Sequence, residues 1–236
     1  MSIKKHIPNT ITCFNLLSGC LSILFTCENR ILWASGMIFV AAVFDFFDGF
    51  AARLLNAKSP IGGELDSLSD VVSFGVAPSF IIVWFLSETG VEWWIHNVNV
   101  FPMLAFVLAI FAALRLAKFN IDTRQSTSFI GLPVPAVGLF VASLPFLIFK
   151  LSHGSALYKF IINPYFLLGI VVIFSWLMVS EVPFFSFKIK NLKFKENILR
   201  YFVVIFAIVA IIILKLEALP FIFLFYILLS VICFRG

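Results

Sequence analysis

Residues 45–70 read DFFDGFAARLLNAKSPIGGELDSLSD, and this stretch decides what kind of protein the chain forms. It carries four aspartates, Asp45, Asp48, Asp66 and Asp70, inside or at the edge of segments that are otherwise apolar. An aspartate at the centre of a membrane-spanning helix costs about 2.5–3.5 kcal/mol of insertion free energy. Four such residues need partners of opposite charge, so the stretch predicts a cation-binding site within a membrane protein.

The remainder of the chain has the composition of a membrane protein. Of its 236 residues, 62% are hydrophobic and 12% are charged, whereas soluble domains average about 45–50% apolar and about 25% charged residues. The mean hydropathy of +1.10 excludes a soluble globular protein. At about 20 residues per span, the length predicts a single membrane domain over residues 1–236. The basic residues are scattered and form no face, so no nucleic-acid partner is expected.

The apolar runs predict an all-α fold, a polytopic membrane bundle of about eight transmembrane helices. The runs are residues 11–27, 31–53, 66–86, 101–118, 134–150, 162–180, 198–214 and 218–234. A turn is expected at residues 59–63, SPIGG, between the second and third helices. An even number of spans puts both termini on one side, and most of the 17 basic residues fall on that side. The positive-inside rule therefore predicts that both termini are cytoplasmic.

The spacing of the aspartates predicts two acidic helix faces that oppose each other. Asp45 and Asp48 are three residues apart and Asp66 and Asp70 are four apart, so each pair lies on one face of its helix. A short cytoplasmic connection makes the two helices neighbours. Two divalent cations balance the charge of four carboxylates, and ligands that are all oxygen suit Mg²⁺, Mn²⁺ or Ca²⁺ better than zinc.

Small residues and one arginine lie beside the acids. Gly49 and Ala52 leave the helix surface bare, and Arg53 offers a planar fork of donors that suits phosphate oxygens. Together with metals, these residues indicate a diphosphate site. The alternative is a set of buried ion pairs that only packs helices, but Arg53 alone is near enough to neutralise the carboxylates.

The pattern D-x2-D-G-x2-A-R-x8-G-x3-D-x3-D, from Asp45 to Asp70, resembles the signature of the CDP-alcohol phosphotransferases. The resemblance implies an integral membrane enzyme that transfers a phosphatidyl or similar group from a CDP-linked donor to an alcohol and releases CMP. It implies that the four aspartates hold two divalent ions, Mg²⁺ or Mn²⁺, and that Asp70 deprotonates the acceptor hydroxyl. It further implies that Gly49, Arg53 and Ser59 contact the donor, and that the protein forms a homodimer.

Flanking segments narrow the resemblance. Residues 7–19, 66–78, 115–120 and 131–136 are similar to the membrane-embedded phosphatidylserine synthases of bacteria and archaea. This similarity implies CDP-diacylglycerol and L-serine as substrates, and an active site facing the cytoplasm from the inner or plasma membrane of a prokaryotic cell. It covers residues 7–140, the expected catalytic region. Residues 160–236 carry no such motif and are expected to be additional C-terminal membrane helices.

Further residues are predicted to bind the two substrates. Asn9 and Thr12 lie at the cytoplasmic mouth of the first span and are expected to reach the cytidine, with helix capping as the alternative. Ala52 and Gly62 belong to the same donor site. The serine carboxylate needs a cation, and the fourth span ends in basic residues that could instead be topology anchors. The candidates for the serine site are Arg115, Lys118, Asn120 and Arg124.

Two other functions fit part of the sequence. Within the family, the acceptor could be glycerol phosphate or inositol phosphate, or the enzyme could use an archaeal ether-lipid donor with serine. A sugar-phosphate acceptor would need a denser basic cluster near the acids. Outside the family, a divalent-cation transporter would use intramembrane carboxylates as an ion site. Such a transporter needs a polar path to the opposite side of the membrane, which the spans do not provide.

Overall fold

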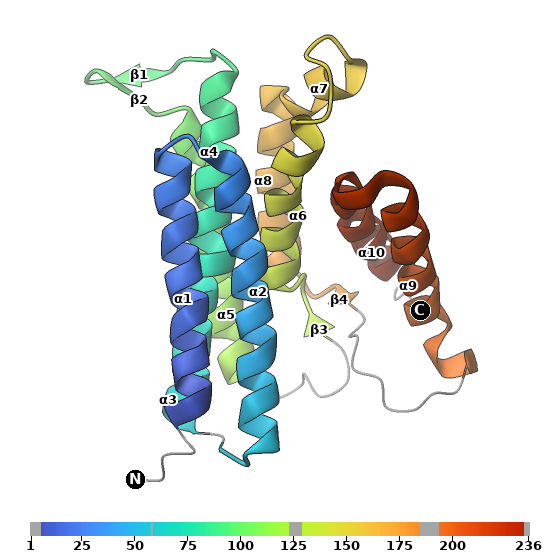
Figure 1. Cartoon of the computed structure of the whole chain (residues 1–236). Coiled ribbons are helices and arrows are strands. Elements are labelled where there is room, and N and C mark those ends of the chain that lie inside the picture. The colour runs from blue at the N-terminus through green and yellow to red at the C-terminus, as the bar shows by residue number, and fades with distance from the viewer. Residues whose placement is uncertain (1–5, 58, 123–128, 185–193, 234–236) are drawn as a thin grey trace.

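The structure is a computed structural model that describes residues 6–57, 59–122, 129–184 and 194–233. These residues are almost entirely helical (Figure 1). In chain order the helices are α1 (His6–Cys27), α2 (Ile31–Leu54), α3 (Pro60–Asp70), α4 (Ala77–Glu88), α5 (Val107–Ile121), α6 (Val134–Ile148), α7 (Ala156–Ile161), α8 (Pro164–Val179), α9 (Phe194–Leu214) and α10 (Leu219–Cys233). A π-helix, Val71–Val76, joins α3 to α4, and 3-10 turns at Pro102–Phe106 and Lys215–Ala218 precede α5 and α10.

Five helical segments within the described residues are long and apolar enough to cross a membrane. They are His6–Cys27, Ile31–Leu54, Pro60–Glu88, Pro102–Ile121 and Arg200–Ile232. Helices α6 and α8 are also apolar but shorter. The Arg200–Ile232 segment contains the second 3-10 turn, and its two halves, α9 and α10, pack side by side as a hairpin (Figure 1). The prediction of an all-α fold is confirmed, and five segments have the length and composition of membrane spans, whereas the predicted number of about eight spans stays a prediction.

Two predicted boundaries near the acidic stretch differ from the structure. Helix α1 begins at His6, not at residue 11. The turn predicted at residues 59–63 is wrong, because Pro60 is the first residue of α3. Ser59 caps this helix by accepting a hydrogen bond from the Gly62 N–H at 3.1 Å, and proline is well suited to a first helical position. The chain reverses just before, where Asn56 adopts a φ of 49°.

Small and polar side chains form the buried face of α1. They are Thr12, Asn15, Ser18, Gly19, Ser22 and Thr26. Small residues let membrane helices approach closely. At Gly19 the approach is so close that a Cβ atom would lie 2.5 Å from Ser73 Oγ and 2.8 Å from Ser73 Cα. Helix α1 therefore lies directly against α3 and the π-helix that follows it.

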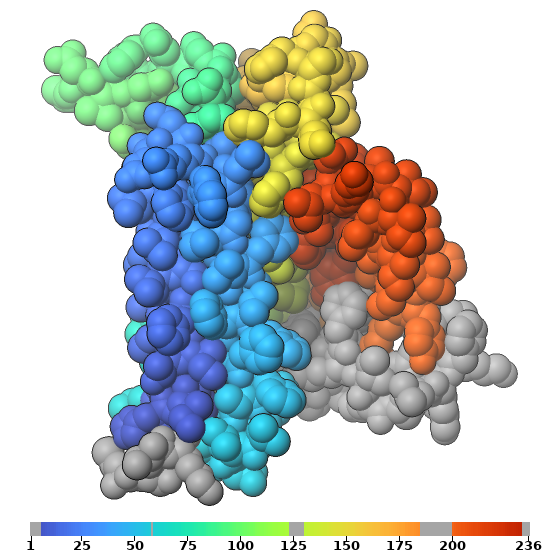
Figure 2. All heavy atoms as spheres, viewed as in Figure 1, coloured from blue at the N-terminus to red at the C-terminus, as the bar shows by residue number. Residues whose placement is uncertain are grey.

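The structure contains two short strand pairs, one within a local hairpin and one between distant parts of the chain. Strands β1 (Trp94–Ile95) and β2 (Val98–Asn99) form a hairpin at the end of the bundle opposite to the N-terminus (Figure 1). Strand β3 (Phe129–Ile130) pairs antiparallel with β4 (Pro183–Phe184), and the Gly131 N–H donates to Val182 O at 2.8 Å. This second pair ties the α5–α6 connection to the segment after α8. Figure 2 shows the α9–α10 hairpin beside the bundle, where α10 packs on α6.

Candidate active site

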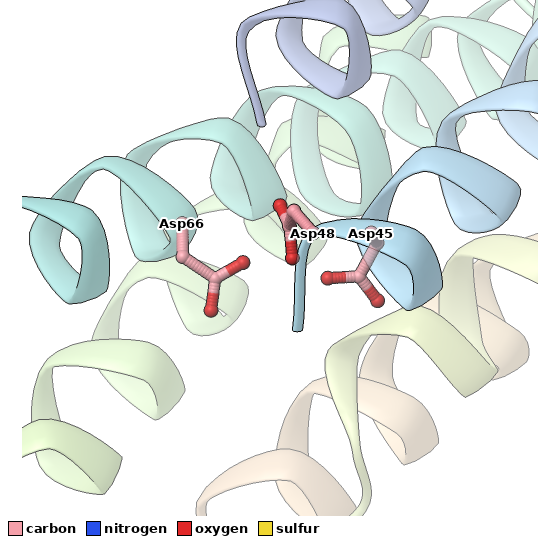
Figure 3. A group of neighbouring side chains, drawn as sticks. All are labelled: Asp45, Asp48 and Asp66. Atoms are coloured by element: carbon pink, nitrogen blue, oxygen red, sulfur yellow. The ribbon is translucent and has the colours of Figure 1, made fainter. Parts of the chain in front are cut away.

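Helices α2 and α3 bring three of the four aspartates together. Asp45 and Asp48 lie in the second half of α2, and Asp66 lies near the middle of α3. One carboxylate oxygen from each lies within 4.8 Å of the other two. In Figure 3 the three carboxyl groups turn toward a common space between the helices. The site is near the end of the bundle at which α1 begins and α2 ends (Figure 1).

The donor set at this cluster fits a hard divalent cation. Asp48 is 6% exposed, and its Oδ2 atom is buried without a hydrogen-bond partner. The Oδ1 atom of Asp66 is buried without a partner as well. Unpaired buried carboxylate oxygens are costly, and all-oxygen ligands suit Mg²⁺, Mn²⁺ or Ca²⁺. Asp45, Asp48 and Asp66 are therefore the residues that would hold a metal ion.

Asp70 occupies a different position from the other three aspartates. It lies one helical turn beyond Asp66, outside the 4.8 Å group, and is 7% exposed. Its Oδ1 atom accepts a hydrogen bond of 3.1 Å from Nδ2 of Asn15 on α1. Asn15 was not among the predicted site residues. The signal that could have revealed it is a polar residue within an apolar span, on the same helix face as Thr12.

A cavity of about 330 Å³ opens next to the carboxylates. It lies between α1, the end of α2 and the start of α3, and Asp48 and Asp66 form part of its wall. All seven residues predicted to bind the CDP-linked donor line it. They are Asn9, Thr12, Gly49, Ala52, Arg53, Ser59 and Gly62.

Gly49 and Gly62, two of the three glycines in the cavity wall, are small for different structural reasons. A Cβ atom at Gly49 would meet no other atom within 4 Å, so this helix position faces open space. A Cβ atom at Gly62 would lie 3.0 Å from Asn9 Oδ1 and 3.1 Å from Ser59 Oγ, so here glycine lets α1 and the α3 N-terminus approach. Arg53 is exposed and makes no ion pair within the described part of the chain. Its guanidinium is available to a ligand.

The residues predicted for the serine site fall into separate environments. Arg115 is 4% exposed, and its guanidinium carbon lies 5.0 Å from the centre of the Phe119 ring. Its Nε atom is buried and has no hydrogen-bond partner among the described residues. Asp122, at the end of α5, is a charged neighbour. Asn120 exchanges hydrogen bonds with Ser67 on α3 at 3.0 and 3.2 Å. Arg124 lies outside the described residues.

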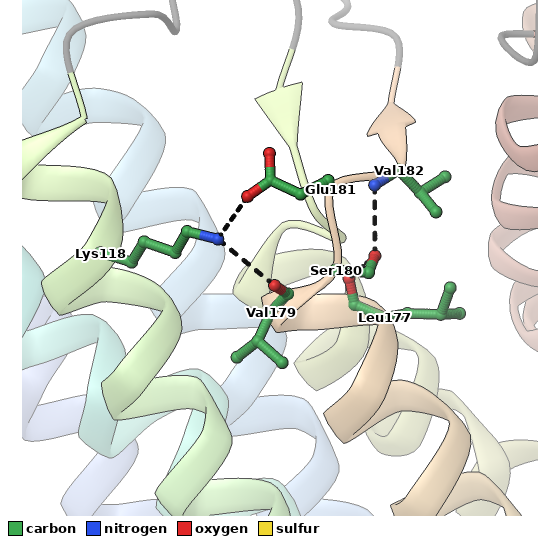
Figure 4. A network of polar contacts seen from close by, with 6 residues as sticks. All are labelled: Lys118, Leu177, Val179, Ser180, Glu181 and Val182. Atoms are coloured by element: carbon green, nitrogen blue, oxygen red, sulfur yellow. Dashed lines mark hydrogen bonds and ion pairs between the residues drawn. The ribbon is translucent and has the colours of Figure 1, made fainter.

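Lys118 already has partners within the protein. Its Nζ atom lies 2.8 Å from a carboxylate oxygen of Glu181 and 3.5 Å from Val179 O, as Figure 4 shows. Both partners belong to the segment at the end of α8. Lys118 thus connects α5 to the end of α8 and the residues just before β4. Glu181 neutralises part of the charge of Lys118.

Comparisons with known proteins show which family this sequence resembles. A sequence model of the family described as CDP-alcohol phosphatidyltransferase matches residues 5–184. Among similar proteins, the CDP-diacylglycerol–serine O-phosphatidyltransferase of Bacillus subtilis is 36% identical over 188 residues, 78% of this chain and 92% of the relative. The proteins of that name from Helicobacter pylori strain J99 and Methanocaldococcus jannaschii are 34% and 31% identical. These matches cover 90% and 78% of this chain, and 84% and 76% of the relatives.

Proposed function

This chain belongs to the CDP-alcohol phosphatidyltransferase family, and we propose that it transfers the phosphatidyl group of CDP-diacylglycerol to L-serine, producing phosphatidylserine and CMP. The observation that carries the proposal is the cluster of Asp45, Asp48 and Asp66, which lies beside a cavity. The wall of this cavity contains Asp48, Asp66 and Arg53. Carboxylates that bind cations beside a free guanidinium suit a diphosphate ligand. The names of the relatives indicate which donor and acceptor are used.

The aspartates are proposed to bind two divalent ions, Mg²⁺ or Mn²⁺. Asp45, Asp48 and Asp66 would supply most ligands and Asp70 would supply one oxygen. When bound, such ions neutralise the negative charge of the diphosphate and of the departing CMP.

The residues of the chain then have separate roles in the transfer. Arg53 binds phosphate oxygens of the donor, while the bare surface at Gly49 and Ala52 lets the diphosphate approach α2. Asn9 and Thr12 contact the cytidine. Asp70 takes the proton of the serine hydroxyl as the serine oxygen forms a bond to the phosphorus that carries the diacylglycerol. The bond between this phosphorus and the CMP oxygen breaks, and CMP leaves with the electron pair.

Arg115 is the proposed partner of the serine carboxylate. Its Nε atom is buried and has no hydrogen-bond partner among the described residues. A buried donor without a partner is costly unless a ligand accepts its hydrogen bond. Asn120 is close to the acids through its contact with Ser67. Lys118 is a weaker candidate, because Glu181 competes for its charge.

The proposed membrane arrangement has eight spans. This number would result if the five long segments and the two shorter apolar helices all cross the membrane, and if the last long segment crosses it twice, as α9 and α10. Both termini and the aspartates would then face the cytoplasm of a prokaryotic cell, according to the distribution of basic residues. The homodimer implied by the resemblance stays a prediction.

The experiment that tests the function is an assay of CMP release by the purified protein in detergent. CDP-diacylglycerol is supplied with Mg²⁺ or Mn²⁺ and with L-serine, glycerol 3-phosphate or inositol phosphate in parallel, and Asp70→Asn is the matched variant. We expect release that requires serine and a metal and is lost in the variant.

Other results would change the proposal in defined ways. Release with another alcohol would keep the reaction and change the acceptor. Absence of release with every alcohol, in a protein that still binds Mn²⁺, would contradict the transferase and favour the cation transporter.

A further inference from the structure

Asn15 lies at the centre of the contact between α1 and the catalytic helices. Its side chain is fully buried, and its Nδ2 atom donates a hydrogen bond of 3.1 Å to Asp70 Oδ1. The two residues are 55 positions apart in the sequence, so the contact exists only because α1 and α3 pack together.

Two neighbouring hydrogen bonds fix the position of Asn15 relative to Asp70. The Ser73 hydroxyl donates to the backbone carbonyl of Asn15 at 3.0 Å, and the Ser69 hydroxyl donates to the carbonyl of Thr12 at 3.3 Å. Both serines flank Asp70 in the sequence. Gly19, one turn further along α1, permits the close approach of the helices. The backbone at Asn15 therefore cannot shift without moving the segment that carries Asp70.

The orientation of the Asn15 amide follows from the chemistry of its partner. An ionised carboxylate accepts hydrogen bonds and donates none, so the amide nitrogen has to face Asp70. The Asn15 Oδ1 atom is then buried without a hydrogen-bond partner within the described residues. The amide thus satisfies the carboxylate and leaves its own oxygen unpaired, which is not the pattern of a residue that serves helix packing alone.

An amide is suited to hold a general base. It donates a hydrogen bond to one oxygen of the carboxylate and does not take up the proton that the base receives. Each carboxylate oxygen has two acceptor positions, so Oδ1 of Asp70 can keep the hydrogen bond from Asn15 and also contact a cation, while Oδ2 is left for the proton.

We propose that Asn15 is the positioning residue of Asp70: its amide fixes the rotation of the carboxylate so that Oδ2 is directed toward the acceptor hydroxyl. The inference rests on the proposed function, in which Asp70 is the base. It adds α1 to the catalytic unit, which the acidic signature alone confines to α2 and α3.

The test compares two substitutions of Asn15 with a control on the same contact. Asn15→Leu has a similar size and no donor, and Asn15→Asp keeps the shape but replaces the donor with an acid. Ser69→Ala removes a hydrogen bond between α1 and α3 at the same level without touching Asp70. For each protein, kcat and both KM values are measured, together with Mn²⁺ binding by electron paramagnetic resonance and the Tm in detergent.

We expect kcat to fall by at least about 10-fold in both Asn15 variants, because a hydrogen bond to a charged group is lost. The KM values and the affinity for Mn²⁺ should stay within about 3-fold of the wild type, because Asp45, Asp48 and Asp66 are unchanged. Ser69→Ala should lower kcat much less than either Asn15 variant, because the Asn15 amide still donates to Asp70 and the Ser73 hydrogen bond to Asn15 remains. A role in packing alone predicts instead that Asn15→Leu, which has a similar size and adds no charge beside Asp70, keeps the activity.

The outcomes separate this inference from the proposed function. A wild-type protein that releases no CMP with serine contradicts the function itself. An active wild type whose Asn15 variants retain kcat, or lose no more of it than Ser69→Ala, overturns the role of Asn15. A loss of Mn²⁺ affinity as large as the loss of kcat would also overturn it, because Asn15 would then act on the metal site.

Discussion

Single atoms left without partners indicate where ligands belong in this protein. Within the part of the chain that the structure describes, Asp48 Oδ2 and Asp66 Oδ1 at the acidic cluster and Arg115 Nε on α5 have no hydrogen-bond partner. Buried polar atoms in folded proteins nearly always have hydrogen-bond partners. At the residue scale, these atoms suit the proposed ligands. The aspartate oxygens suit metal cations, and Arg115 Nε suits the carboxylate of serine.

Gly49 provides a direct test of the donor cavity. Gly49→Val is expected to raise the KM for CDP-diacylglycerol about 10-fold, because the added side chain enters a space that the protein leaves empty. Steady-state kinetics with varied donor measure this effect. The control is Gly36→Val on the same helix, where a Cβ atom also meets nothing within 4 Å but no donor cavity is present. Equal KM values in the two variants would contradict the location of the donor.

Arg115 provides the corresponding test of the acceptor site. Arg115→Ala is expected to raise the KM for serine roughly 10- to 100-fold, since a charge-assisted hydrogen bond is lost. The KM for CDP-diacylglycerol should change little. Lys118→Ala is the control and should have a smaller effect, because Lys118 is paired with Glu181. Equal increases in both KM values for Arg115→Ala would rule out the assignment.

At the scale of elements, α1 packs against α3 and the π-helix and so holds the segment that carries Asp70 in place. Its small polar face contacts α3 and the π-helix, and its first turn contributes Asn9 to the donor cavity. A π-helix widens the helical turn and is often found at functional sites. Here it begins directly after Asp70, where α1 approaches most closely. The position of the proposed base therefore depends on a helix outside the acidic signature.

Gly19 tests this dependence. Gly19→Ala is expected to destabilise the protein by about 1–3 kcal/mol, because the methyl group collides with the backbone of Ser73. Gly36→Ala is the matched control, since it gives the same gain in helix propensity without a collision. Thermal unfolding in detergent compares the two. If Gly19→Ala proves as stable as Gly36→Ala, the close packing of α1 is contradicted.

At the scale of the whole molecule, function requires the acidic end of the bundle to face the compartment that supplies serine. The residues at the two ends differ accordingly. Trp33, Trp84, Trp93 and Trp94 lie toward the end opposite to the aspartates, as expected for an interfacial aromatic belt. The acidic cluster lies near the other end, where the described basic residues Arg53, Arg115 and Lys118 also lie.

Labelling of single cysteines tests the proposed orientation. In a variant without the native cysteines, Asn56→Cys should react with an impermeant maleimide only from the cytoplasmic side, because it lies between α2 and α3. Gly154→Cys, between α6 and α7, should react only from the opposite side. Intact cells and inverted vesicles distinguish the two sides. Labelling of both positions from one side would contradict the arrangement of eight spans.

The acidic signature and the apolar runs determine much of this protein from the sequence alone. They predict an all-α membrane protein and its acidic helices, because hydropathy and helical spacing are local properties. The sequence also identified seven of the residues that line the cavity as candidates for the donor site. The sequence misplaced the start of α3, because SPIGG has the composition of a turn and also of a capped helix N-terminus. The hydrogen bond from Asn15 to Asp70 and the pairing of Lys118 with Glu181 join residues 55 and 63 positions apart. Such contacts arise only when helices pack, and no local sequence pattern encodes them. The tertiary structure alone therefore decided which residue orients Asp70. It also decided which basic residue has a buried nitrogen without a hydrogen-bond partner among the described residues.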